Sequence, residues 1–241
     1  MKIIKAADYN DMSRKAANII FSQVSLFPGC ILGLATGSTP LGTYKELVAK
    51  YISGDADFSG VRSFNLDEYC GMKPDNPQSY HYYMHENLFR HINIKPENVH
   101  VPDGFTKEED CRKYDEMIAS FGGIDLQLLG LGKTGHIGFN EPAGSFPKYT
   151  HKVALKEQTI KDNSRFFSSI DDVPKFAVTM GLMSIMQSKR VLMVVNGIGK
   201  AETLKRALFG PVTPQVPASI LQLHPNFTVV ADKDALSKIC G

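Results

Sequence analysis

Residues 130–142, GLGKTGHIGFNEP, contain the side chains best suited to proton transfer. Histidine is the residue type most often used for proton transfer in enzymes, so His136 is a candidate to exchange a proton with a ligand oxygen. Glu141 is a candidate to orient the imidazole or to stabilise its charge. A lone histidine can serve packing alone, but a glycine-rich loop lets the backbone approach a ligand closely, which favours catalysis here.

Asp67 is a second candidate for acid–base chemistry. It lies in FNLDEY, residues 64–69, directly after an apolar run that predicts a strand. Its carboxylate is therefore expected at the carboxyl end of a strand, where ligands of parallel sheets bind. The alternative is that Asp67 and Glu68 cap a helix or form an exposed pair in a loop.

Residues 32–40, LGLATGSTP, predict an anion site. Small and hydroxyl residues stand where a strand gives way to a helix, so backbone N–H groups and the helix dipole converge on one point. An ordinary strand–helix turn is the alternative. The candidate phosphate ligands are Thr36, Gly37, Ser38, Thr39, Arg165 and Lys200.

Several other kinds of site are not indicated. Neither G-x-G-x-x-G nor G-K-[ST] occurs in the anion segment, so we expect no nucleotide cofactor. His81 and His85 are four residues apart but lack an evident third ligand, so we expect a structural or surface role and no metal. The cysteines show no C-x-x-C pairing, and we expect reduced thiols at Cys30, Cys70, Cys111 and Cys240.

The elements that would position these residues alternate along the chain. Apolar residues at helical spacing predict helices at residues 12–24, 41–51, 80–92 and 111–121. The predicted N-terminal caps are Thr39, Ser79 and a capping box of Thr106 and Glu109. Apolar runs predict strands at residues 30–35, 61–66, 98–101, 124–130, 153–155, 190–196 and 227–231.

This alternation predicts an α/β fold, a single Rossmann-like domain over residues 1–241. Its central sheet should be mostly parallel, with helices on both faces. Lys and Arg number 27 against 25 Asp and Glu, which gives no reason to expect nucleic acid or a membrane as partner. The first residues lack a signal-peptide pattern, so we expect a cytoplasmic protein that binds a small molecule.

Taken together, these segments resemble the glucosamine-6-phosphate deaminase family. The similarity covers LGLATGSTP, FNLDEYCG, SYHYYMHENLF, GLGKTGHIGFNEP, NSRFF and SILQLHPN, which is nearly the whole chain. The resemblance implies isomerisation and deamination of glucosamine 6-phosphate to fructose 6-phosphate and ammonia, in amino-sugar catabolism, without a cofactor. The alternatives are a 6-phosphogluconolactonase-like hydrolase and a non-catalytic sugar-phosphate sensor.

The resemblance also implies individual roles. Asp67 would move the proton from C2 to C1, and His136 with Glu141 would open the ring. The phosphate would be held at residues 36–39, Arg165 and Lys200. The segment at about 155–178 resembles the family's active-site lid.

Two departures from the family pattern affect these expectations. Thr134 stands where many relatives have Asp or Asn, so the catalytic set here is Asp67, His136, Glu141 and Thr134, with a hydroxyl replacing a carboxylate. Allosteric members of the family carry basic residues soon after the NEP motif, whereas here that stretch reads AGSFPKYTHKV, which implies an incomplete allosteric site. We therefore expect a monomer or small homo-oligomer with simple saturation kinetics.

Overall fold

The computed structural model describes residues 1–164 and 167–239. A seven-stranded sheet lies at its centre, in the order β1-β10-β9-β6-β2-β3-β5, and every neighbouring pair is parallel. Its strands are β1 (Lys2–Ala6), β2 (Ile31–Leu34), β3 (Arg62–Asn65), β5 (Val99–His100), β6 (Leu126–Leu129), β9 (Val191–Val195) and β10 (Phe227–Asp232). The predicted α/β fold with a mostly parallel sheet is confirmed.

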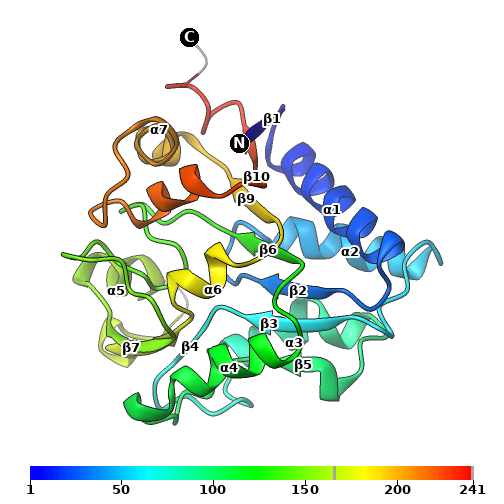
Figure 1. Ribbon diagram of the computed structural model, residues 1–241, viewed down its shortest axis with the longest axis horizontal. Helices are drawn as coiled ribbons and strands as arrows, with labels where there is room; N and C mark the ends of the chain where they lie inside the picture. Colours follow the sequence, from blue (N-terminus) through cyan, green and yellow to red (C-terminus); the bar gives the residue numbers. More distant parts are fainter. Residues whose placement is uncertain (165–166, 240–241) are drawn as a thin grey trace.

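Helices cover both faces of this sheet (Figure 1). The longer ones are α1 (Tyr9–Leu26), α2 (Leu41–Ile52), α3 (Tyr80–Asn87), α4 (Arg112–Ser120), α5 (Glu157–Asn163), α6 (Leu182–Met186) and α7 (Ala201–Phe209). Short 3-10 turns are η1 (Phe89–His91), η2 (Pro96–Asn98), η3 (Glu108–Asp110), η5 (Ile170–Asp172), η6 (Ile198–Lys200) and η7 (Pro217–Leu223).

The alternation of side chains along the central strands produces two cores. In β9, Leu192 and Val194 pack with α1, α2 and α3, whereas Val191, Met193 and Val195 pack with α4, α6 and α7. Successive residues of a strand point to opposite faces, so a fully apolar strand needs a helical layer on each side. This accounts for the continuous apolar runs of the sequence.

A smaller antiparallel sheet lies beside the main one, with the order β4-β8-β7. It consists of β4 (Asp67–Tyr69), β7 (His151–Ala154) and β8 (Phe176–Thr179). Neither β4 nor β8 was predicted, because strands of three or four residues are too short to show a periodic pattern. Asp67 therefore begins a strand, paired with Thr179, instead of lying in a loop.

Two predicted helix caps are wrong, and one is confirmed. The hydroxyl of Ser79 accepts a hydrogen bond from Tyr82 N, as a cap of α3 should. Helix α2 begins after Pro40, and the Thr39 hydroxyl instead donates to Asn196 Oδ1 at 3.0 Å. The η3 turn delays the start of α4, so Cys111 occupies its N-cap position without a side-chain hydrogen bond.

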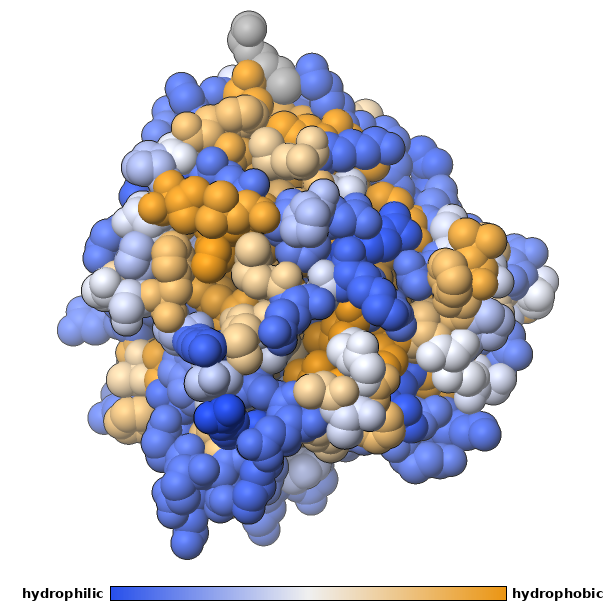
Figure 2. Space-filling view, in the orientation of Figure 1, coloured by the Kyte–Doolittle hydropathy of each residue, from blue (hydrophilic) through white to orange (hydrophobic). Residues whose placement is uncertain are grey.

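Figure 2 shows hydrophobic side chains over the region where Figure 1 draws α7 and η7. Phe209, at the end of α7, and Leu223, at the end of η7, are both exposed. In the described residues, no helix is long and apolar enough to cross a membrane.

Candidate active site

Four neighbouring strands of the main sheet, β9, β6, β2 and β3, end at one cavity of about 300 Å³. Its lining includes the anion segment after β2, Asp67 after β3, His136 in the loop after β6, and Lys200 beyond β9. Parallel strands bring their carboxyl ends to one edge, which gathers residues that are far apart in the sequence. The structure therefore places the predicted base, histidine and anion segment around a single space.

The anion segment is fixed by tyrosine hydroxyls that bind its carbonyl groups. Tyr83 of α3 donates to Gly37 O at 2.6 Å, and Tyr9 of α1 donates to Ser38 O at 3.1 Å. Tyr44 of α2 likewise donates to Ala35 O. Since the C=O and the N–H of one peptide unit point in opposite directions, these contacts turn the following N–H groups away from the helices. Gly37 has φ of 100°, a conformation that favours glycine.

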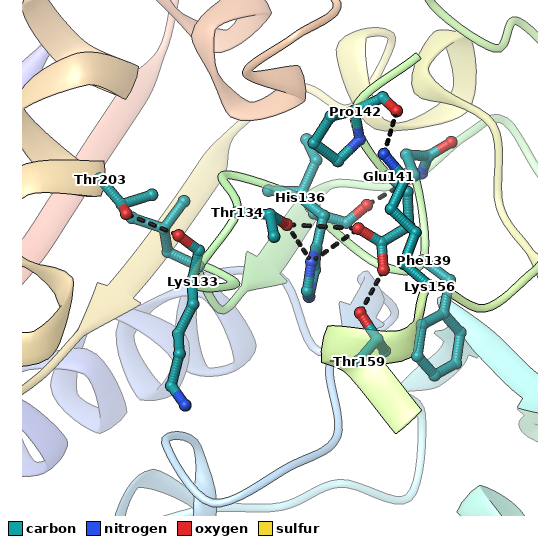
Figure 3. A network of polar contacts seen from close by, with 12 residues as sticks. Lys133, Thr134, His136, Phe139, Glu141, Pro142, Lys156, Thr159 and Thr203 are labelled. Carbon is teal, nitrogen blue, oxygen red and sulfur yellow. Dashed lines mark hydrogen bonds and ion pairs between the residues drawn. The ribbon is translucent and has the colours of Figure 1, made fainter. Parts of the chain in front are cut away.

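Of the two basic residues predicted for the anion site, the structure describes one. Lys200 lines the cavity, and its ammonium donates to Leu131 O at 2.7 Å, so it also ties the β6 loop to the start of α7. Arg165 lies outside the described residues. Lys133 lines the cavity although the sequence did not single it out, and Figure 3 shows its side chain extending away from His136.

Asp67 is buried at the inner side of the cavity, with 5% of its surface exposed. Burial raises its pKa to about 8, and the charge of neighbouring Glu68 adds to the effect. A carboxylate in this environment is a stronger base than an exposed one. Gly138 lies against it, since a Cβ at that position would be 3.3 Å from Asp67 Oδ2.

Glu68, next to Asp67, binds backbone N–H groups. Its carboxylate accepts hydrogen bonds from the backbone N–H groups of Tyr69, Tyr80 and His81, at 2.8 to 3.0 Å. It therefore satisfies free donors at the start of α3. Burial raises the pKa of Glu68, while these backbone hydrogen bonds oppose the shift.

His136, Thr134 and Glu141 form one polar network (Figure 3). Thr134 Oγ1 lies 2.8 Å from His136 Nδ1 and donates to Glu141 Oε2 at 3.2 Å. The distance from His136 Nδ1 to Glu141 Oε2 is 3.4 Å. Burial opposes ionisation of Glu141, but the hydrogen bond and charge of His136, with hydrogen bonds from Thr159 and Thr134, lower its pKa.

Besides Lys133, sequence reasoning missed three other polar residues that line the cavity: Tyr80, Asn196 and Thr159. Tyr80 is the first residue of the helix predicted at residues 80–92, and its ring stacks on Phe139 at a centroid distance of 5.9 Å. Asn196 and Thr159 carry no pattern that marks them. By contrast, His81 and His85 are exposed on α3, and the described part of the chain holds no group of three or more potential metal ligands.

A parallel α/β sheet with a hydroxyl-rich anion segment and an acid–base pair at its carboxyl edge defines a protein that acts on a small anionic ligand. Residues 8–230 match the family described as glucosamine-6-phosphate isomerases/6-phosphogluconolactonase. The chain belongs to this family.

Similar proteins of known name cover nearly the whole chain. A glucosamine-6-phosphate deaminase of Lachnoclostridium phytofermentans is 60% identical over 95% of this chain and 98% of its own length. One of Thermoanaerobacter pseudethanolicus is 54% identical over 99% of this chain and 95% of its own length. A solved structure described as a monomeric glucosamine-6-phosphate deaminase has 43% identity and a TM-score of 0.96, and the match covers 99% of this chain and 100% of that one.

A 6-phosphogluconolactonase from Thermotoga maritima is similar in fold alone. It has 23% identity and a TM-score of 0.76, over 96% of this chain and 99% of that one. The fold is therefore shared across the family, whereas high identity is found with proteins named deaminases.

Proposed function

We propose that this chain is a glucosamine-6-phosphate deaminase, converting glucosamine 6-phosphate and water to fructose 6-phosphate and ammonia. The observation that carries the proposal is that Asp67, His136 and residues 36–39 line the same cavity. Relatives at 50–60% identity are named for this activity. The lactonase alternative rests on similarity of fold and is not favoured.

The substrate phosphate would bind at Thr36, Gly37, Ser38 and Thr39, with Lys200 and Arg165 supplying positive charge. The tyrosine contacts of the anion segment support this role, since they fix the orientation of its peptide groups at the wall of the cavity. Binding energy at the phosphate would hold the sugar carbons in place for reaction.

Ring opening would be the task of His136, with Glu141 and Thr134 as its partners. Both partners meet Nδ1, so the proton would reach the ring oxygen through Nε2. As the C1 hydroxyl loses its proton, the ring C–O bond breaks and an open-chain aldehyde forms. Glu141 would stabilise the imidazolium charge between proton transfers.

Asp67 would then move a proton between neighbouring carbons. It removes the C2 proton, and the electron pair shifts through C1 to the aldehyde oxygen, which takes up a proton from water and gives an enolamine. Return of the proton to C1 leaves an imine at C2. Water adds there, and the C–N bond breaks to release ammonia. The raised pKa of Asp67 supports its use as a base.

We also propose that the protein is a monomer, that it lies in the cytoplasm and that residues 1–241 form one domain. The structural relative described as monomeric supports the first, and the free thiols of Cys30, Cys70 and Cys111 fit a reducing compartment. We further propose that residues 155–178 act as a lid: Thr159 of α5 lines the cavity, and β8 pairs with β4 and so anchors the end of the segment.

The test is to incubate the purified protein with glucosamine 6-phosphate and to measure ammonia and fructose 6-phosphate together. Equal amounts of both products are expected, with no hydrolysis of 6-phosphogluconolactone. Asp67→Asn should retain binding of the substrate while turnover falls by roughly 100-fold or more. Lactone hydrolysis without ammonia release would replace the proposal with the alternative, and an active Asp67→Asn variant would remove Asp67 from its role.

A further inference from the structure

We propose that Thr159 is a positioning residue for the acid–base pair: its hydroxyl holds Glu141 in the orientation that faces His136, so that the pair depends on the placement of helix α5. The inference rests on the proposed function. It adds a residue outside the catalytic set and links the set to the segment at 155–178.

The two oxygens of Glu141 are held by different elements, as Figure 3 shows. Oε2 accepts from Thr134 and lies 3.4 Å from His136 Nδ1, both within the loop after β6. Oε1 accepts from the Thr159 hydroxyl, which comes from α5. A carboxylate held on one oxygen alone can rotate about its last bond, whereas a partner on each oxygen fixes its plane.

The hydrogen bond from Thr159 to Glu141 is buried, so its loss would not be compensated by water. Thr159 is 4% exposed and Glu141 is 5% exposed, so water cannot readily replace the hydroxyl. A buried carboxylate that loses a hydrogen bond is left with unmet acceptor capacity, and it will turn to find another donor. Any such turn changes the contact between Oε2 and His136.

A second contact ties the same helix to the same loop. Lys156, in the N-cap position of α5, donates from Nζ to Pro142 O at 2.6 Å. On the loop after β6, the two contacts from α5 are made to adjacent residues, Glu141 and Pro142. The position of α5 is thereby coupled to the residue that faces His136.

The charges around Glu141 agree with this arrangement. Among the described residues, His136 is the titratable group whose hydrogen bond and charge lower the pKa of Glu141, at a distance of 3.4 Å from Nδ1 to Oε2. The hydrogen bond from Thr159 is one of the contacts that lower the pKa of Glu141. Its loss should therefore raise that pKa and weaken the ion pair with the protonated imidazole.

Thr159→Val tests the proposal, since valine preserves shape and removes the hydroxyl. We expect kcat to fall about fivefold, the equivalent of losing one hydrogen bond, with KM changed by less than about twofold. In the protein without substrate, carbon-13 NMR of the Glu141 carboxyl should show its pKa raised. Thr159→Ser restores the hydroxyl and should restore both values. If the valine variant does not fold, Thr159→Ala carries the same expectations.

Thr150→Val is the matched control. Thr150 is also buried and donates its hydroxyl to a carboxylate, that of Asp115 at 3.0 Å, but it does not line the cavity. This variant should lose stability to a similar extent and keep both kcat and the Glu141 titration. An unchanged Glu141 titration in Thr159→Val, or an equal loss of kcat in Thr150→Val, would overturn the proposal. The NMR titration needs no turnover, so its outcome is separate from failure of the proposed function, which would appear as wild-type protein that releases no ammonia.

Discussion

The imidazole ring of His136 lies directly against the backbone of Gly132. A Cβ at position 132 would be 2.2 Å from both Cε1 and Nε2 of the ring, well inside van der Waals contact. The loop thus closes on its own histidine, and Gly132 N donates to His136 O at 3.0 Å. Glycine is needed here for space, because any side chain would push the ring out of place.

Gly132→Ala should accordingly displace His136 and reduce turnover by roughly 10- to 100-fold, since a shift of about 1 Å in a catalytic group has effects of that size. Steady-state kinetics measures the loss. Gly144→Ala is the matched control, because a Cβ at position 144 meets nothing within 4 Å. Equal activity of the two variants would show that the ring can move without consequence.

Asp67 should make folding stability depend on pH in a defined direction. Its pKa is about 8 in the folded protein against an ordinary value of 3.8, so the folded state keeps a proton that the unfolded chain releases. The stability supplied by Asp67 is therefore present at low pH and is lost as pH rises from about 4 towards 8.

Asp67→Asn removes this ionisation. The free energy of unfolding of the variant, relative to that of the wild type, should rise by on the order of 2 kcal/mol when the pH is raised from 5 to 9. Urea denaturation at the two pH values measures the difference. A gap between the proteins that does not change with pH would mean that Asp67 ionises as easily in the folded state as in the unfolded chain.

Thr134 occupies the position between His136 Nδ1 and Glu141 Oε2. Thr134→Asp would place a second carboxylate beside Glu141 and raise the pKa of Glu141 by like-charge repulsion. We expect the acidic limb of the kcat profile to move to higher pH by roughly one unit. Thr134→Asn, which adds no charge and keeps a side chain that can donate a hydrogen bond to Glu141, serves as the control. An identical pH profile in the aspartate variant would show that this position is not coupled to the pair.

Saturation kinetics should be simple. After the NEP motif the chain reads AGSFPKYTHKV, and the resemblance to the family implies that the allosteric site is incomplete there. Initial rates against glucosamine 6-phosphate should give a Hill coefficient of about 1, with no activation by N-acetylglucosamine 6-phosphate. A sigmoidal curve that this acetylated sugar phosphate makes hyperbolic would refute the expectation.

The sequence by itself determined the class of fold and most candidate residues. Apolar runs long enough to be buried on both faces required a parallel sheet between two helical layers, as seen in β9. Parallel strands then required Asp67, His136 and the anion segment to share one edge. These conclusions need only local patterns and the geometry of the sheet.

Tertiary structure alone decided which side chains meet. Thr159 reaches Glu141 across 18 positions of the chain, and Thr39 bonds to Asn196 across 157 instead of capping its own helix. The short strands β4 and β8 exist because they pair with each other, not because their residues alternate clearly. A hydrogen bond forms only where the fold brings donor and acceptor together, and local residue patterns do not give the distance between residues far apart in the chain.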